Sequence, residues 1–208
     1  MRRAVAREGR EGVPHWATRA VKASMERAAR PSSEPAVVAV RVEGAPMTDS
    51  AASFARRLSA AAAAMGDLQG PVEAGDPWPL AEHYGTEPES SWGPREVLVH
   101  VAEMLPYWRG EIDRILIEDD PPFGRVADDP IRTLTIGRDR SLPIRELFAR
   151  IEAGAARYGP LLATIGPAEL GRHGRHPTRG ELTVADVLEL NVVGHLEGHV
   201  TQLREALG

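Results

Sequence analysis

Apolar residues recur at steps of three and four in four stretches after residue 47, which is the spacing of one face of an α-helix. The predicted helices cover residues 50–65, 91–118, 142–165 and 183–207. The pattern is clearest in the second helix, at Val97, Val101, Met104, Trp108, Ile112 and Ile115. Strand-like alternation occurs only at 36–42 (AVVAVRV), so the sequence predicts an all-α protein, a four-helix bundle of about 160 residues.

The ends of the predicted helices carry recognisable capping residues. Ser50 or one of the two residues before it can cap the first helix, and Pro94 lies near the first turn of the second. Thr183 with Asp186 three residues later forms an acidic variant of the capping box at the start of the fourth helix. These signals support the four helices that the periodicity predicts.

The segments between the helices differ in length and character. We expect Gly159–Pro160 to bend the third helix. The connection 119–140 holds three prolines and five aspartates, and a loop of that length in a compact domain is usually functional or contains short secondary structure. The polar stretch 166–181 leads into the fourth helix and is expected to form no strand.

Residues 1–46 differ from the rest of the chain. Their formal charge is +4, whereas residues 47–208 carry −9. Arginine and glutamate interrupt the segment too often for a secretory signal or a membrane span. Two interpretations stay open: a native start at Met47 behind a largely disordered upstream extension, or a genuine basic tail. The predicted division is therefore an extension at 1–46 and the bundle at 47–208.

The composition narrows the class of protein. With 42% hydrophobic residues, 26% charged residues and a net charge of −5, the chain fits a soluble globular protein of one domain, or of one domain plus an extension. We expect the protein to be cytoplasmic. The mild acidity argues against nucleic acid or an anionic membrane surface as partner. The absence of cysteine excludes disulfides, thiolate metal ligands, iron–sulfur clusters and a cysteine nucleophile.

Three histidines form a candidate metal site. His195 and His199 lie four residues apart on one face of the fourth helix, and His100 lies on the inward face of the second. We expect Gly194 and Gly198 to let another helix approach closely. Two imidazoles from one helix and one from another can hold a divalent ion with open coordination positions. If they do, their nitrogens lie within about 4 Å of a common point.

Two other interpretations of these histidines are a zincin-type metalloprotease site and histidines that only pack in the hydrophobic core. A zincin requires glutamate directly after the first histidine, but Glu197 follows His195 by two positions and is expected to face solvent. Single histidines on apolar helix faces are usually core residues with one hydrogen bond. That interpretation is harder to sustain for two buried imidazoles on one face with a third opposite.

Two segments resemble the DinB/YfiT-like superfamily of bacterial four-helix-bundle metal-binding proteins. They are SWGPREVLVH, which opens the second helix and ends at His100, and GHLEGHVTQL in the fourth helix. The resemblance covers residues 48–208 and implies that His100, His195 and His199 bind the metal. His176–Pro177 also resembles a recurrent element of the family. Pro106 departs from the pattern, and we expect it to kink the second helix.

The resemblance implies a function as well. Family members resemble transferases and isomerases that use mycothiol, bacillithiol or glutathione, although many have no known activity. We therefore expect an enzyme that depends on a divalent metal ion (zinc, nickel or iron), either an S-transferase that joins a low-molecular-weight thiol to a small-molecule electrophile or a related thiol-dependent isomerase. Because the chain lacks cysteine, the sulfur has to come from that thiol. The alternatives are a non-catalytic metal- or ligand-binding stress-response protein and a structural bundle that forms a homodimer.

Candidate substrate-binding residues are Trp108, Arg109 and His176. Trp108 can line a pocket or pack in the core. Arg109, or Arg132 or Arg138 in the long connection, can hold a carboxylate of the thiol or remain exposed. The sequence identifies no catalytic residue apart from the three metal ligands.

Overall fold

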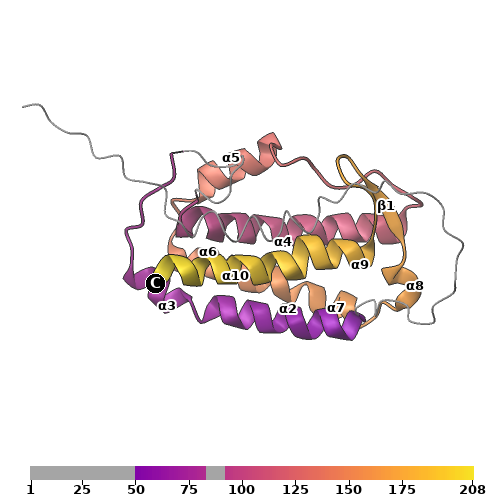
Figure 1. Cartoon of the computed structure of the whole chain (residues 1–208), viewed down its shortest axis with the longest axis horizontal. Helices are drawn as coiled ribbons and strands as arrows, with labels where there is room; N and C mark the ends of the chain where they lie inside the picture. The colour runs from indigo at the N-terminus through magenta and orange to yellow at the C-terminus, as the bar shows by residue number, and fades with distance from the viewer. Residues whose placement is uncertain (1–49, 83–91) are drawn as a thin grey trace, which may run out of the picture.

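Four long helical segments form the bundle in the computed structural model, which describes residues 50–82 and 92–208 (Figure 1). They are α2 (Ala51–Gly66), α4 (Pro94–Ile117), α6 (Ile144–Ala156) and a C-terminal segment made of α9 (Val184–Val187), η3 (Leu188–Val193) and α10 (Gly194–Leu207). Helix α4 packs against α6 and α10, and both of these also contact α2. The structure confirms the predicted all-α four-helix bundle.

Short elements join the long helices. They are α3 (Gln69–Ala74), α5 (Pro130–Asp139), α7 (Tyr158–Leu162), α8 (Pro167–Leu170), β1 (His173–His176) and β2 (Gly180–Thr183). Strands β1 and β2 form an antiparallel hairpin at one end of the bundle, and α5 packs on α4 (Figure 1). The strand-like alternation at 36–42 and the extension 1–46 lie outside the described residues.

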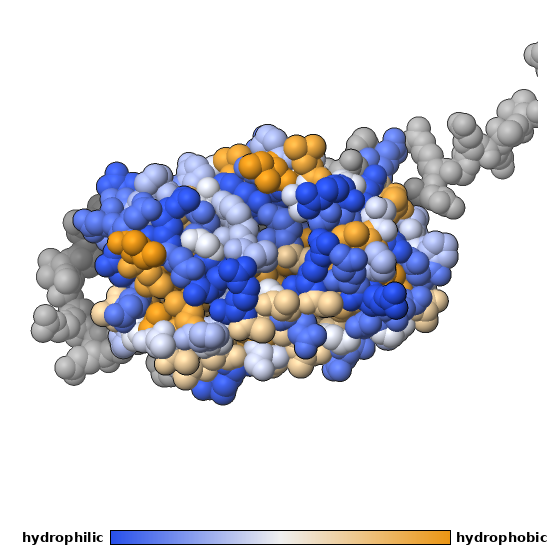
Figure 2. All heavy atoms as spheres, turned by 180° about the vertical axis from the view of Figure 1, so that it is seen from behind, coloured by the Kyte–Doolittle hydropathy of each residue, from blue (hydrophilic) through white to orange (hydrophobic). Residues whose placement is uncertain are grey.

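The predicted apolar positions build the core. The inward positions of α4 that the periodicity identified are all buried, and Ile112 and Ile115 are completely inaccessible. Burying each such side chain contributes about 1.5–3 kcal/mol relative to leaving it exposed. On the face seen in Figure 2, hydrophilic side chains predominate and apolar ones gather in a few separate groups. The large exposed apolar side chains include Ile131 and Leu134 on α5.

Two expectations about local structure were wrong. The hairpin β1–β2 occupies the stretch that was expected to contain no strand. The sequence did not indicate it because each strand has only four residues and lacks an apolar alternation. The hairpin is anchored from outside: Arg175 donates to the carbonyl of Pro121, and Phe123 donates to the carbonyl of Arg175. The third helix ends at Ala156 and α7 starts at Tyr158, so the break comes just before the predicted bend.

The close approach of helices also differs from the prediction. A Cβ on Gly198 would meet open space, and one on Gly194 would meet the carbonyl oxygen of Glu189 in its own helical segment at 2.6 Å. The tight contact lies at Gly154 of α6, where a Cβ would come within 3.0 Å of Leu105 Cβ on α4. Helix α4 runs on through Pro106 to Ile117.

A π-helix, η3, interrupts the fourth predicted helix. It spans six residues between α9 and α10, and the sequence analysis did not anticipate it. Arg57 of α2 ties this region to the bundle, because its guanidinium donates to both Glu189 and Glu197. Glu197 is therefore engaged in an ion pair with α2, on a different side of α10 from the histidines.

No helix within the described ranges combines the length and the apolar character that a membrane span requires.

Candidate metal centre

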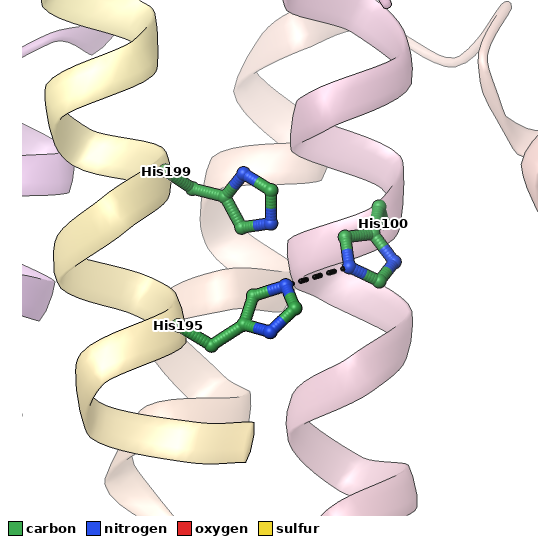
Figure 3. Close-up of side chains that lie close together, drawn as sticks. All are labelled: His100, His195 and His199. Atoms are coloured by element: carbon green, nitrogen blue, oxygen red, sulfur yellow. Dashed lines mark hydrogen bonds between the residues drawn. The ribbon is translucent and has the colours of Figure 1, made fainter. Parts of the chain in front are cut away.

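The structure brings His100, His195 and His199 together. His100 projects from the first half of α4, and the other two project from adjacent turns of α10 into the space between the helices (Figure 3). One ring nitrogen from each histidine lies within 4.8 Å of the other two, so all three are within about 4 Å of a common point. Nε2 of His100 is 3.0 Å from Nε2 of His195. The spacing meets the geometric expectation for a shared ion.

Gln202 orients one of the three imidazoles. Its side-chain oxygen lies 2.9 Å from Nδ1 of His199, and both residues are buried. With that oxygen as acceptor, Nδ1 carries the proton and Nε2 keeps the lone pair that a metal ion needs. The sequence signal for this contact is the three-residue separation on one helix face.

Burial keeps the imidazoles of His100 and His195 neutral. The pKa values of His100 and His195 are well below the ordinary value, first because burial disfavours the charged ring and then because the neighbouring histidines and Arg132 repel a proton. A neutral imidazole is the form that binds a metal. His100 and His195 therefore fit a divalent ion in protonation state, and all three histidines fit it in geometry.

Two further buried residues were not predicted as site residues: Trp92 beside His100, and Asn191 in the turn before α10. The indole ring of Trp92 meets His100 edge-on, with 5.3 Å between the ring centroids. Asn191 lies in η3, four residues before His195, and its buried Oδ1 has no hydrogen-bond partner among the described residues. π-helical turns often occur at functional sites, and here the turn directly precedes the two histidines of α10.

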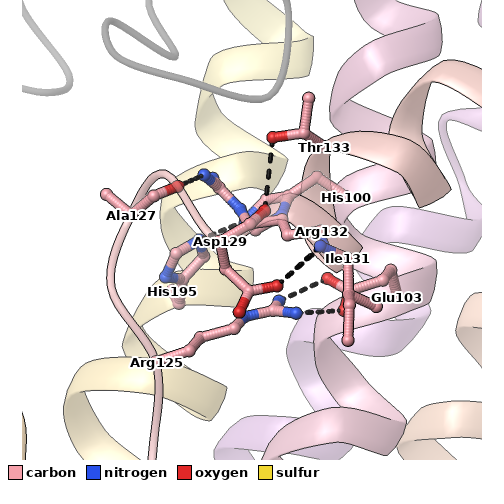
Figure 4. Close-up of polar contacts among 9 residues, drawn as sticks. All are labelled: His100, Glu103, Arg125, Ala127, Asp129, Ile131, Arg132, Thr133 and His195. Atoms are coloured by element: carbon pink, nitrogen blue, oxygen red, sulfur yellow. Dashed lines mark hydrogen bonds and ion pairs between the residues drawn. The ribbon is translucent and has the colours of Figure 1, made fainter.

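The connection between α4 and α6, which includes α5, adds positive charge to the site (Figure 4). Both guanidinium nitrogens of Arg125 donate to Glu103 at 2.6 Å, and its guanidinium lies 3.9 Å from the centroid of the Tyr107 ring. Nη1 of Arg132 donates to the carbonyl of Ala127 at 2.6 Å. Both arginines lower the pKa of His100. The connection is thus partly helical and faces the metal centre.

The predicted substrate-binding residues lie in two different places. His176 on β1 is buried and stacks on Trp108 at 6.3 Å, with Phe123 edge-on at 5.7 Å. Arg109 pairs with Asp113 and donates to the carbonyl of Arg157, so its guanidinium lies toward α6 and α7. The structure therefore brings Trp108 and His176 together in an aromatic cluster about two turns along α4 from His100, and it does not bring Arg109 there.

A groove of about 410 Å³ lies between α4, α5 and α6. Its polar lining includes Glu103, Asp139 and Arg150, and the three histidines are not among its lining residues. The groove is thus separate from the candidate metal centre.

Comparisons with known proteins agree with the four-helix-bundle fold. In the solved structures, YfiT from Bacillus subtilis, described as a probable metal-dependent hydrolase with an unusual four-helix bundle topology, matches with a TM-score of 0.59 and 17% identity. The match covers 82% of this chain and 91% of that one. No curated protein matches the chain. Residues 53–203 match the DinB superfamily, and the chain therefore belongs to that family.

Proposed function

We propose that the protein is a divalent-metal-dependent enzyme that transfers a small electrophile to a low-molecular-weight thiol. The observation that carries the proposal is the convergence of three imidazoles from α4 and α10. Three nitrogen ligands suit zinc, nickel or iron and leave coordination positions for a reactant. When bound, such an ion lowers the pKa of a coordinated thiol or water and so supplies a nucleophile at neutral pH.

The residues of the chain prepare this chemistry. Gln202 holds His199 in the tautomer whose Nε2 faces the centre, and burial keeps His100 unprotonated. The positive charge of Arg132 favours an anionic thiolate over a neutral thiol. In the transfer, the thiolate sulfur forms a bond to the electrophilic carbon, the leaving group departs with its electron pair, and the thiol proton passes to solvent.

A second candidate is metal-dependent hydrolysis, in which water takes the place of the thiol. The similarity of fold to YfiT favours it, because that protein is described as a probable metal-dependent hydrolase. The third candidate is a non-catalytic protein that binds a metal through the same three histidines.

Metal analysis of protein purified without a histidine tag tests the premise. We expect about one divalent ion per chain in the native protein, loss of that ion in His195→Ala, and retention in His173→Ala, a matched change at an exposed histidine on β1. Unchanged metal content in His195→Ala would contradict the site.

Turnover assays then separate the three functions. The native protein and His195→Ala are screened with glutathione, mycothiol or bacillithiol plus a bimane electrophile, and in parallel with ester and amide substrates alone. Thiol-dependent turnover that His195→Ala abolishes supports the transferase, turnover of the second set supports the hydrolase, and bound metal without either supports the binding protein.

A further inference from the structure

Asn191 carries a buried polar group that the described part of the chain leaves unsatisfied. The residue is only 4% exposed, and its Oδ1 has no hydrogen-bond partner among the described residues. Buried polar atoms in folded proteins are nearly always paired, because an unpaired one lowers the stability of the fold. A buried acceptor that the fold does not use points to a hydrogen-bond donor from outside the chain.

The ion pairs of Arg57 show which way Asn191 faces. The guanidinium of Arg57 on α2 donates to both Glu189 and Glu197, so these two residues, eight positions apart, lie on one side of the C-terminal segment. Asn191 and His199 are each two positions further along the chain than one of the glutamates. They therefore share a second side of the segment, although one lies in η3 and the other in α10.

The exposure of the neighbouring residues agrees with this direction. Leu190 and Gly198, also eight positions apart, are both exposed, whereas Val192 and Val200 are both buried. The eight-residue repeat thus holds on each side of the segment in spite of the π-helical turn. Asn191 therefore lies on the side from which the two histidines of α10 project toward α4 (Figure 3).

Along this side, Asn191 lies between the hairpin and the metal centre. The C-terminal segment leaves the hairpin at Val184 and reaches Asn191 four residues before His195. Each of its three parts packs on α4 (Figure 1). One helical turn advances about 5.4 Å, so the amide is within reach of a small molecule held at the three histidines.

We infer that Asn191 binds the reactant at the metal centre, with its Oδ1 accepting a hydrogen bond from an N–H or O–H group of that reactant. The inference rests on the proposed function, since it assumes that a reactant enters at the three histidines. It also names the class of reactant, one with such a donor close to its metal-binding atom. An analogue without the donor is disfavoured, because the buried oxygen then stays unpaired.

The test uses full-length, tag-free protein loaded with Co²⁺, whose absorption reports on its ligands. One arm titrates acetohydroxamate against N-methylacetohydroxamate, which chelate metals through the same two oxygens but differ in the N–H group. The other arm titrates 2-mercaptoethanol against 2-methoxyethanethiol, which share the thiol but differ in the O–H group. The variants are Asn191→Leu, Asn191→Asp, which keeps an acceptor, and Leu190→Ala as a matched control at the exposed neighbouring position.

We expect the native protein and Leu190→Ala to bind the donor-bearing member of at least one pair about tenfold more tightly than its partner. Asn191→Leu should lose this preference, and Asn191→Asp should keep it. If Asn191→Leu fails to fold, Asn191→Ala takes its place. Equal affinities within both pairs in the native protein, or the same preference in Asn191→Leu, would overturn the inference. A change in the Co²⁺ spectrum of Asn191→Leu without any probe would also overturn it, because Asn191 would then be a metal ligand.

The two arms separate failure of the inference from failure of the proposed function. A sulfur-to-cobalt charge-transfer band with both thiols, but no Asn191-dependent preference within either pair, leaves the thiol chemistry standing and removes the role of Asn191. Absence of that band, with an Asn191-dependent preference for acetohydroxamate, keeps the role of Asn191 and removes the thiol.

Discussion

The side-chain oxygen of Gln202 lies 2.9 Å from Nδ1 of His199, one helical turn further along α10. Both residues are buried, with only 5% of His199 and 6% of Gln202 exposed, so the contact is largely shielded from solvent. Hydrogen bonds of this kind fix the tautomer and the orientation of a metal-binding imidazole. The pair therefore gives a direct test of how the centre is held.

Replacing Gln202 with methionine, which has a similar size but no strong acceptor, should weaken metal binding about 10- to 100-fold. Gln202→Glu retains an acceptor and should bind metal nearly as well as the native protein. Competition with a chromophoric chelator measures both affinities. Equal affinity in the native protein and Gln202→Met would show that the contact does not orient the ligand.

The stability of the metal-free protein should fall as the pH drops below about 6.5, partly because of His176. Its pKa is lowered, first by burial between Trp108 and Phe123 and then by Arg179. In this range the unfolded chain binds a proton at His176 that the folded chain does not, so protonation favours unfolding, by up to about 1.4 kcal/mol per pH unit.

Urea unfolding of the native protein and His176→Leu at pH 7.5 and 5.5 isolates this contribution. The free energy of unfolding should fall less in His176→Leu over this interval, since the other titrating groups are common to both proteins. An identical decrease in both proteins would rule out a depressed pKa at His176.

Asn191→Leu should leave the free energy of unfolding unchanged or raise it by about 1 kcal/mol. The substitution removes a buried carbonyl oxygen that accepts no hydrogen bond among the described residues, and such a group costs stability. Chemical denaturation of the metal-free protein measures the change, with Leu190→Ala at the exposed neighbouring position as control. A large loss of stability would indicate that Asn191 makes a structural contact.

Gly154→Val should destabilise the bundle by about 1–3 kcal/mol. The new side chain would meet Leu105 where α6 crosses α4, and the Cβ of Leu105 cannot move without its helix. Gly110→Val, which introduces the same side chain on α4 facing open space, should have little effect. The melting temperatures of the two variants, measured by thermal unfolding, test this prediction. Equal melting temperatures would contradict a tight helix contact at Gly154.

The sequence predicted the bundle and the meeting of the three histidines because both depend on helical periodicity. Val97 and Ile112 follow the same spacing that turns His100 inward, and the four-residue step places His195 and His199 on one face. A strong local pattern of this kind does not need tertiary information to be interpreted.

The features that sequence reasoning missed depend on tertiary contacts. Arg109 and Arg132 are both arginines near apolar residues, and only the folded chain shows that Asp113 engages the first while the second lies over Trp92. The hairpin is stabilised by pairing with residues 121–123, more than 50 positions away in the chain. Neither relationship leaves a periodic signal.

The π-helix η3 also determines which way the end of the chain faces. Each of its hydrogen bonds encloses one residue more than an α-helical bond does, so the segments before and after it differ in phase by about 100°. Helix α9 can therefore pack against the hairpin while α10 turns its histidines toward α4. Deleting one residue from 188–193 would restore a continuous α-helix and rotate His195 and His199 away from His100. The centre thus depends on the number of residues in this turn as much as on the identity of its three ligands.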